Sequence, residues 1–303
     1  MKRIVGIGAC VADTLYTVPR YPGEDTKLRA SGSRQAGGGP TATGLVTAAK
    51  LGAEAAYIGV LSDDAAGKFL QADFEKYGVS TEGVRICFGC RSFASVIWLS
   101  EESASRTCVF DRGDLPPLRL SDEQNRMIAG ADLLMVDGNE MEAAVEAAML
   151  IRKNHGKVLY DCGGLYPQVE RLLKRTDIMI PSEEFALGHT GAGNAESAAR
   201  ELMKRYHPEV VVITQGKRGG MLFDGSRIVR YPAYPAAVKD SNGAGDVFHG
   251  AFASAVLRGY PYEVCCHISS AVSAIKCMGI GARESVPDFV TVKQYLKENG
   301  YEL

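Results

Sequence analysis

Short runs of apolar residues alternate along the chain with longer stretches in which apolar positions recur every three or four residues. A continuous apolar run predicts a strand buried on both faces of a sheet, and the longer spacing predicts an amphipathic helix. The predicted strands are 3–8, 54–60, 132–136, 157–160, 177–180 and 209–213. The predicted helices are 41–51, 64–77, 141–153, 196–206, 247–257 and 262–276. This alternation predicts an α/β fold with a doubly wound, mostly parallel sheet flanked by helices.

Two regions of the chain interrupt the alternation. Residues 91–100 and 106–112 predict two strands around a polar turn, and 16–35 is punctuated by Pro and Gly and too polar for a core helix. They predict a small separate β-sheet, a lid over the carboxyl ends of the main strands, where such folds bind ligands. The alternative is an edge extension of the main sheet. The predicted division is a core of 1–13, 37–84 and 115–303 and a β-lid of 14–36 and 85–114.

Composition narrows the class of protein. The 303 residues include 46% hydrophobic and 23% charged residues, ordinary values for a globular chain. With 34 basic and 36 acidic residues there is no electrostatic bias toward nucleic acid or an anionic membrane, and we expect neither as a partner. Apolar windows fall short of the ~18 residues of a membrane span, and the start turns glycine-rich too early for a signal peptide. We expect a soluble, cytoplasmic protein.

The chain has eight cysteines, of which Cys87 and Cys90 have C-x-x-C spacing. A structural zinc site needs four ligands, and no second pair follows. A redox C-x-x-C would be expected at the start of a helix rather than between strands. We therefore expect ordinary reduced thiols that pack as small hydrophobic groups.

A run of small residues leads into the helix predicted at 247–257. Gly243, Ala244 and Gly245 allow backbone N–H groups at the start of the helix to approach an anion, and the helix dipole favours negative charge there. A carboxylate beside a phosphate costs repulsion unless it takes a proton from the attacking hydroxyl, which makes Asp246 a candidate catalytic base. The dipole is expected to lower the pKa of Asp246. The alternative to a phosphate site is a purely structural role, in which the Asp caps the helix after a tight glycine turn.

Three other segments carry candidate chemistry. Gly38 and Gly39 precede a Pro at the first turn of a predicted helix, where the backbone is free to approach a polyol. Asp13 follows the first strand, where a carboxylate can accept hydrogen bonds from vicinal hydroxyls. Residues 214–220 follow another strand and can wrap the phosphates and ribose of a nucleotide. Each segment is also compatible with a plain turn, cap or hairpin.

These segments, in this order, resemble the PfkB or ribokinase family of carbohydrate kinases over nearly the whole chain. The resemblance implies a ribokinase-like fold with a β-lid, ATP and Mg²⁺ as cofactors, and a small-molecule sugar as substrate. It implies that Asp246 is the base and that Gly243, Ala244 and Gly245 form an anion hole for the transferred phosphate. The implied sugar-binding residues include Asp13, Gly38 and Gly39. The implied ATP-binding residues are Ser182, Thr214, Gly216, Gly219 and Asn242.

The chain departs from the family pattern at two positions. Thr43 stands where the family usually has an Asn that contacts a substrate hydroxyl, and it cannot make both amide contacts. Phe185 replaces the terminal carboxylate of a segment tied to magnesium through water, so Glu183 or Glu184 is expected to serve instead. Local motifs around the glycines and in 247–251 and 274–277 resemble the sulfofructose kinase branch. The lid does not reproduce the polar contacts of that branch, and its substrate is not carried over.

The resemblance also implies a monovalent cation beside the anion hole, as in many relatives. Asp240, with carbonyls near Gly279 and Gly281 and the hydroxyl of Ser285, would form an oxygen-rich cage suited to K⁺. Such loops are also ordinary turns.

The expected function is ATP-dependent phosphorylation of a primary hydroxyl of a small sugar or sugar derivative. Arg112 follows the second lid strand and is expected to reach an anionic or strongly polar end of the substrate; the alternative is a solvated charge paired with Asp111 or Asp114. A nucleoside kinase of the same fold, with Trp98 and Phe93 stacking on a base, is one alternative function. A catalytically silent sugar-binding regulator is another. An exposed lid face would permit a homodimer.

Overall fold

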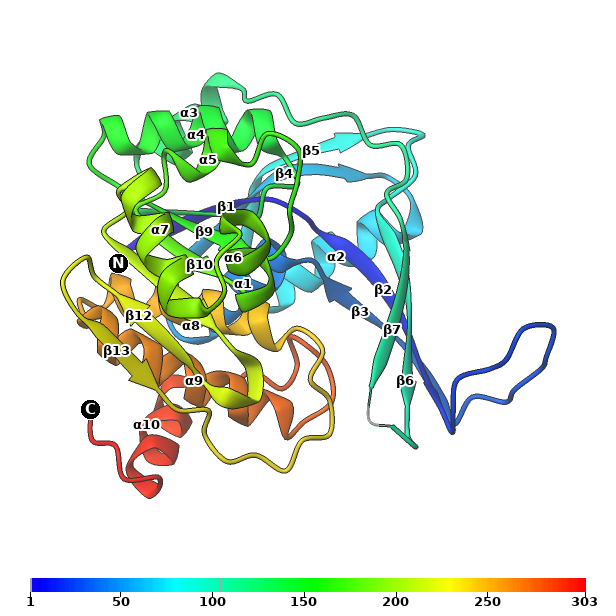
Figure 1. Ribbon diagram of the computed structural model, residues 1–303. Helices are drawn as coiled ribbons and strands as arrows, with labels where there is room; N and C mark the ends of the chain where they lie inside the picture. The colour runs from blue at the N-terminus through cyan, green and yellow to red at the C-terminus, as the bar shows by residue number, and fades with distance from the viewer. Residues whose placement is uncertain (1, 104) are drawn as a thin grey trace.

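A nine-stranded sheet forms the centre of the molecule in the computed structural model, which describes residues 2–103 and 105–303 (Figure 1). The strand order is β13-β12-β11-β10-β9-β8-β1-β4-β5, parallel from β11 to β5, with β12 and β13 antiparallel at one edge. The bounds are β1 (Arg3–Ile7), β4 (Glu54–Ser62), β5 (Val79–Cys87), β8 (Leu133–Val136), β9 (Lys157–Cys162), β10 (Ile178–Pro181), β11 (Val210–Thr214), β12 (Gly220–Phe223) and β13 (Ile228–Tyr231). The mostly parallel sheet predicted from the apolar runs is confirmed.

Helices cover both faces of this sheet, and each face has its own hydrophobic core. On one face lie α1 (Pro40–Lys50), α2 (Ala65–Lys76), α8 (Ala244–Leu257), α9 (Tyr262–Cys277) and α10 (Phe289–Glu298). On the other lie α3 (Asp122–Ala129), α4 (Met141–Lys153), α5 (Glu170–Leu173), α6 (Glu183–Thr190) and α7 (Ala195–Tyr206). None of the helices in the described residues combines the length and apolar character that a membrane crossing requires.

The predicted helices and strands of the core agree with the observed ones, except that α8 begins three residues earlier, at Ala244 rather than 247. The first turn of α8 consists of small residues without apolar periodicity. The apolar spacing therefore predicted only the part of the helix that packs in the core. Gly243, with φ of 73°, precedes this turn as the N-cap residue. A left-handed backbone at this position favours glycine.

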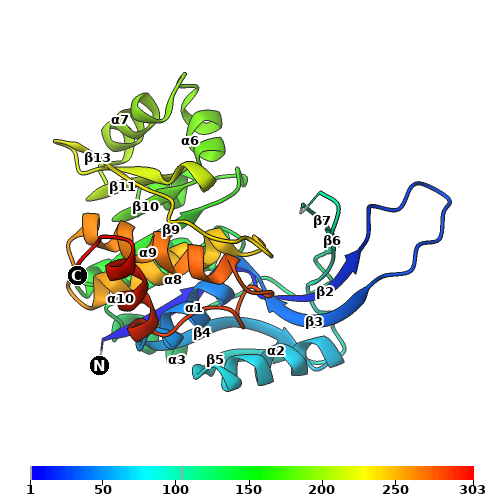
Figure 2. The same ribbon diagram turned by 90° about the horizontal axis from the view of Figure 1, so that it is seen from below.

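Four strands form a second, small sheet in the order β3-β2-β6-β7 (Figure 2). Its strands are β2 (Val11–Val18), β3 (Gly32–Gly38), β6 (Ala94–Ser100) and β7 (Arg106–Asp111), and we call it the small sheet. The bounds differ from those expected. The small sheet takes in 11–13 and 37–38, whereas 85–87 pair with β4 in the main sheet. The loop between β2 and β3 projects from the body (Figures 1 and 2).

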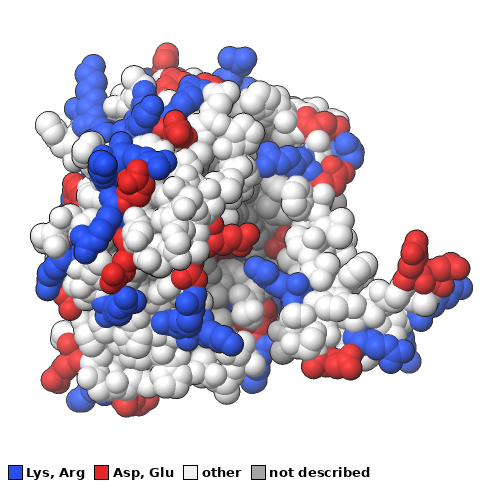
Figure 3. All heavy atoms as spheres, viewed as in Figure 1, with Lys and Arg blue, Asp and Glu red and all other residues white. Residues whose placement is uncertain are grey.

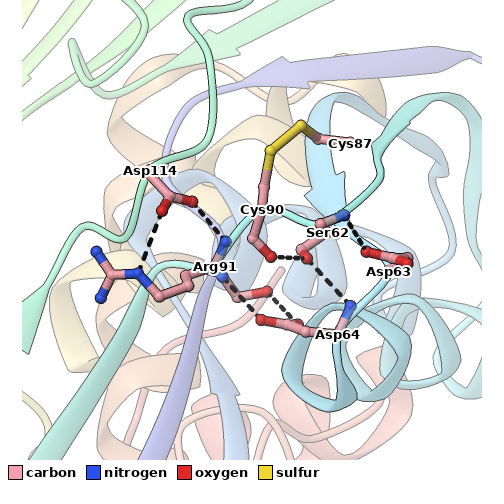
Figure 4. Close-up of a disulfide and its surroundings, with 9 residues drawn as sticks. Ser62, Asp63, Asp64, Cys87, Cys90, Arg91 and Asp114 are labelled. Atoms are coloured by element: carbon pink, nitrogen blue, oxygen red, sulfur yellow. Dashed lines mark hydrogen bonds and ion pairs between the residues drawn. A yellow bond between two sulfur atoms is a disulfide. The ribbon is translucent and has the colours of Figure 1, made fainter.

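Cys87 and Cys90 form a disulfide, which corrects the expectation of reduced thiols at these positions (Figure 4). The turn that follows β5 brings the two Cα atoms to 5.8 Å, within the range that a disulfide spans. The chain after the bridge is fixed to the start of α2, since the Asp64 carboxylate accepts hydrogen bonds from the backbone N–H and the hydroxyl of Ser92 at 2.9 and 2.7 Å. These contacts anchor the beginning of β6.

Candidate active site

The predicted anion hole lies at the start of α8. Asp246 is half-buried in the first turn of this helix, and Ala244 and Gly245 line a cavity of about 530 Å³. A Cβ on Gly243 would come within 2.6 Å of the Cβ of Ala282, so a side chain is excluded there. The N–H groups of the first helical turn have no intrahelical acceptor and can bind an anion. The structure thus places 243–246 at the N-terminus of α8, where their backbone N–H groups can face an anion.

The expected lowering of the Asp246 pKa by the helix dipole is wrong. Burial raises the pKa of Asp246, and the nearby carboxylate of Asp137 raises it further, against opposing effects of His249, Arg106 and Lys276. Burial disfavours the charged form of the carboxylate, and this effect is larger than the opposing effects of the nearby positive charges. A raised pKa makes Asp246 a better proton acceptor than a free aspartate.

His249 and Asp161 form a buried pair beside Asp246 that the sequence did not reveal. Nδ1 of His249 lies 3.3 Å from Oδ2 of Asp161 and 2.6 Å from the carbonyl oxygen of Gly245, and Nε2 lies 3.0 Å from the carbonyl of Ile180. Burial raises the pKa of Asp161 to about 7, opposed by His249. The available signals in the sequence were an acid near the carboxyl end of a strand and a histidine about one helical turn after Asp246.

The predicted sugar-binding residues meet where the small sheet joins the core. Asp13 lies in β2, buried, and one carboxylate oxygen accepts a hydrogen bond from the hydroxyl of Ser95 at 2.6 Å. Burial raises the pKa of Asp13 to about 6, and the charge of Asp246 contributes to the rise. A Cβ on Gly38 would lie 2.0 Å from the other carboxylate oxygen of Asp13. Gly38 is therefore required for Asp13 to occupy this position.

Gly39 precedes α1 with φ of 94°, and a Cβ there would lie 2.3 Å from the carbonyl oxygen of Ala9. Behind the glycine pair lies a buried arginine that the sequence reasoning missed. Arg283 donates to the carbonyl of Gly38 at 2.8 Å and pairs with Asp73 at 2.5 Å. Thr43 is fully buried, and its hydroxyl accepts from Nε of Arg283 at 3.4 Å. In this structure Thr43 therefore supports the guanidinium that holds the glycine loop.

Arg112 follows β7 of the small sheet, and its side chain is exposed. Its guanidinium donates to the side-chain oxygen of Asn139 at 2.8 Å and lies 5.7 Å from the centre of the Phe93 ring. Asp111 and Asp114 both pair with Arg91 instead. Arg112 therefore contacts Asn139 rather than either of these acids, while its side chain is exposed, as the alternative of a solvated charge expects.

The cavity of about 530 Å³ contains much of the predicted nucleotide segment. Its walls come from the end of β11, the following turn, the 231–241 segment and α8 and α9. The lining residues that were predicted are Thr214, Gly216, Gly219, Ala244 and Gly245. Tyr231, Phe248 and Ala274 add apolar surface. A largely apolar cavity that ends at a helix N-terminus can hold a nucleotide with its phosphates toward the helix.

Ser182, Glu183 and Glu184 lie at the start of α6, next to Thr214. Ser182 caps the helix by accepting from the backbone N–H of Phe185 at 3.1 Å. The Glu183 carboxylate accepts from Nε2 of Gln215 at 2.6 Å and pairs with Arg218. Glu184 is exposed. Of the two acids, Glu184 presents its carboxylate to solvent.

The residues of the predicted cation cage also lie together. Oδ1 of Asp240 accepts from the N–H of Asn242, and Oδ2 from the N–H of Gly281, both at 2.8 Å. The hydroxyl of Ser285 donates to the carbonyl of Ile280 at 2.9 Å and lies against Gly279. Lys276 reaches the same place from α9 and donates to the carbonyl of Asp240 at 2.8 Å.

Two arginines of the small sheet approach this loop and were not singled out from the sequence. Arg106 donates to the side-chain oxygen of Asn242 at 3.1 Å, and Arg34 lies 3.8 Å from Asp240. The register of the strands places both on the face of the small sheet that carries Asp13. Figure 3 shows the hollow between the body and the small sheet, with acidic and basic side chains on its walls.

Comparison with known proteins identifies the family of this chain. The model of the pfkB family carbohydrate kinases matches residues 1–288. Ribokinase from Arabidopsis thaliana is 26% identical over 97% of this chain and 81% of its own length, and ribokinase from Haemophilus influenzae is 26% identical over 98% and 99%. A solved structure of the Arabidopsis thaliana enzyme complexed with ribose and ATP superposes with a TM-score of 0.86, at 26% identity over 98% of each chain. The chain therefore belongs to the pfkB family of carbohydrate kinases, phosphotransferases with an alcohol group as acceptor.

Proposed function

We propose that this kinase transfers the terminal phosphoryl group of ATP to a primary hydroxyl of a small sugar or sugar derivative, such as a ketose or a sugar acid, with Asp246 as catalytic base. The observation that carries the proposal is the position of Asp246. It lies in the first turn of α8, next to Gly245, which lines the cavity, and its charge contributes to the raised pKa of Asp13. A sugar held by Asp13 and a phosphate held by α8 would therefore meet at Asp246.

Each step of the transfer has a residue of this chain to perform it. Asp13 and the backbone at Gly38 and Gly39 orient the sugar hydroxyls, and Arg112 contacts the polar end of the substrate. Asp246 takes the proton of the attacking hydroxyl, helped by its raised pKa. The N–H groups of 243–245 stabilise charge on the phosphoryl oxygens, which in a loose transition state is the main contribution that a protein can make.

Thr214, Gly216 and Gly219 hold the nucleotide in the apolar cavity, with Asn242 and Ser182 near its phosphates. Magnesium prefers carboxylate and water oxygens. The exposed Glu184 fits that preference, through water, better than Glu183, whose oxygens already accept from Gln215 and Arg218. When bound with ATP, the ion neutralises charge on the phosphate oxygens.

The alternative functions are less compatible with the site. Trp98 pairs in register with Tyr16, on the face of the small sheet opposite Asp13, where it cannot stack on a base in the cleft. Phe93 packs against Phe110 and lies under Arg112. A silent sugar-binding regulator has no need for a carboxylate with a raised pKa at a phosphate site. Both observations favour the sugar kinase.

The test is an ADP-formation assay across ketoses, aldoses, sugar acids and nucleosides, with and without Mg²⁺. We expect one class of sugar to stimulate ADP formation, and Asp246→Asn to lower turnover by about 10²–10⁴ with ATP affinity nearly unchanged. Turnover above half of the wild-type value in this variant would remove Asp246 from the base role. Stimulation by nucleosides alone would favour the nucleoside kinase.

We also propose that the small sheet is a lid that excludes water from the cleft, and that its outer face joins two copies of the chain. Tyr16, Val96 and Val109 on that face are 37%, 40% and 62% exposed, and their alignment across β2, β6 and β7 makes one apolar surface. The molar mass from light scattering should be that of a dimer. A monomeric mass at micromolar concentration would contradict the pairing.

A further inference from the structure

Lys276, in the last turn of α9, is completely buried. An ammonium group removed from water is costly unless nearby oxygens replace its hydration. Its Nζ donates to the carbonyl oxygen of Asp240 at 2.8 Å and to that of Asn242, and lies 3.9 Å from the Asp240 carboxylate. Burial lowers the pKa of Lys276, while Asp240 and Asp246 oppose that effect. The lysine is thus coordinated by oxygens in the way that a bound cation would be.

The oxygens that hold Lys276 belong to the loop that leads directly into the anion hole. Asn242 precedes Gly243, whose positive φ begins α8. An interaction that fixes the carbonyl of Asn242 therefore fixes the peptide plane that carries the N–H of Gly243, the residue before the first turn of α8. The ammonium also places a positive charge near Asp246, whose pKa it lowers. Lys276 influences both the shape and the potential of the phosphate site.

A monovalent cation fits poorly in the cage predicted for it. Both carboxylate oxygens of Asp240 already accept from backbone N–H groups, and the hydroxyl of Ser285 is directed to the carbonyl of Ile280. The carbonyls of Asp240 and Asn242 accept from Lys276. K⁺ is bound in proteins by carbonyl oxygens that replace its hydration shell. In this protein the ammonium of Lys276, which has the same charge, donates hydrogen bonds to two such carbonyl oxygens.

We propose that the ammonium of Lys276 is a built-in substitute for the monovalent cation, so that this kinase needs no K⁺. Lys276 is a positioning residue: it orders the 240–242 loop and contributes one fixed positive charge. The proposal rests on the proposed function only in treating that loop as part of the phosphate site. The position of the Lys276 ammonium beside Asp240 does not depend on the proposed function.

The first test uses the wild-type protein and K⁺ as the probe. Thermal unfolding is followed in KCl and in tetramethylammonium chloride at equal ionic strength, and, once an acceptor sugar is known, the rate is measured in the same salts. We expect the midpoint of unfolding and the rate to be the same in both salts. A midpoint raised by K⁺ or a rate increased severalfold would overturn the proposal without help from any variant.

The second test removes the ammonium. Lys276→Ala should unfold roughly 5–10 °C below wild type, because it leaves Asp240 without its buried partner, and kcat should fall about 10-fold or more. KCl or NH₄Cl should restore part of both losses by filling the space, whereas tetramethylammonium should not. Lys276→Met loses the charge but fills the space, so it should show the same losses without rescue.

The exposed Lys297→Ala, which also removes one lysine charge, is the matched control and should behave as wild type. A Lys276→Ala protein with wild-type kcat, or one that K⁺ and NH₄⁺ do not stabilise, would reduce Lys276 to a structural residue and overturn the proposal. Since the unfolding midpoint needs no substrate, this outcome can be told apart from a wrong assignment of the sugar kinase activity. If Lys276→Ala does not fold, the wild-type comparison in KCl decides.

Discussion

Adding one methyl group at Gly38 tests the sugar site without altering any charged residue. In Gly38→Ala the new Cβ would lie 2.0 Å from Oδ2 of Asp13 and 2.7 Å from its Cγ. Since 3.4 Å is the start of ordinary van der Waals contact, the carboxylate must move by about 1.4 Å. That movement breaks the hydrogen bond of 2.6 Å from Ser95 and takes the carboxylate away from the substrate hydroxyls.

A displacement of about 1 Å in a positioning group can cost about 100-fold in rate. We therefore expect kcat/KM for the acceptor sugar to fall about 100-fold, or about 2.7 kcal/mol of transition-state binding. The crowding should also lower the free energy of unfolding by about 1–3 kcal/mol. The KM for ATP should stay constant, because the nucleotide cavity is lined by other elements.

The assay is steady-state ADP formation with the sugar that stimulates it best, with each substrate varied in turn. Gly32→Ala is the matched control, because Gly32 lies in the same strand and a Cβ there meets nothing within 4 Å. A Gly38→Ala protein that keeps kcat/KM for the sugar within threefold of the control, or that loses as much kcat/KM for ATP, would contradict the role given to Asp13.

Two further predictions concern the substrate side of the cleft. Arg112→Met keeps much of the apolar stem but loses the charge. We expect kcat/KM for the sugar to fall about 10-fold or more, which corresponds to about 1.4 kcal/mol, with the KM for ATP unchanged. An unchanged kcat/KM for the sugar would mean that Arg112 contacts Asn139 but not the substrate. The pKa of Asp13 near 6 predicts that kcat/KM for the sugar falls as the pH drops below about 6, because protonation removes an acceptor of hydroxyl hydrogen bonds. Persistence of that limb in Asp13→Asn would assign it to Asp161 or Asp246.

The order of the core elements could be predicted from the sequence because parallel strands and their covering helices have distinct apolar periods. The helices α3, α5, α6 and α10 were not predicted, and neither was the strand β5. Polar residues occupy much of its length because only part of this edge strand is buried, and its pattern does not read as a continuous apolar run. The short strands β12 and β13 were missed because four residues carry too little periodicity to distinguish a strand from a turn.

The anion hole and the glycine pair could be predicted because each is a local motif in which small residues adjoin a helix start. The groups that support them could not. Arg283 and Asp73 are 210 residues apart, and Asp161 meets His249 only when β9 and α8 pack together. Lys276 lies in a helix where a lysine normally points to solvent, and no period identifies the one that is buried. The sequence alone does not show whether a charged residue near a turn is solvated or buried against a partner, because the partner comes from a distant part of the chain.

The charges around Asp246 affect both its strength as a base and the binding of phosphate, and they change the two in opposite directions. Burial and Asp137 raise its pKa, which makes it a stronger base, whereas Lys276 and Arg106 lower it and at the same time attract phosphate. The two cations differ in how they are held: Lys276 is buried in the core, but Arg106 is exposed and reaches Asn242 from β7 of the small sheet. The contribution of Lys276 is therefore constant, whereas that of Arg106 depends on where the small sheet lies. A small sheet that moves toward α8 would bring positive charge to the phosphate site as it excludes water, and so would couple closure of the cleft to the presence of the phosphoryl donor.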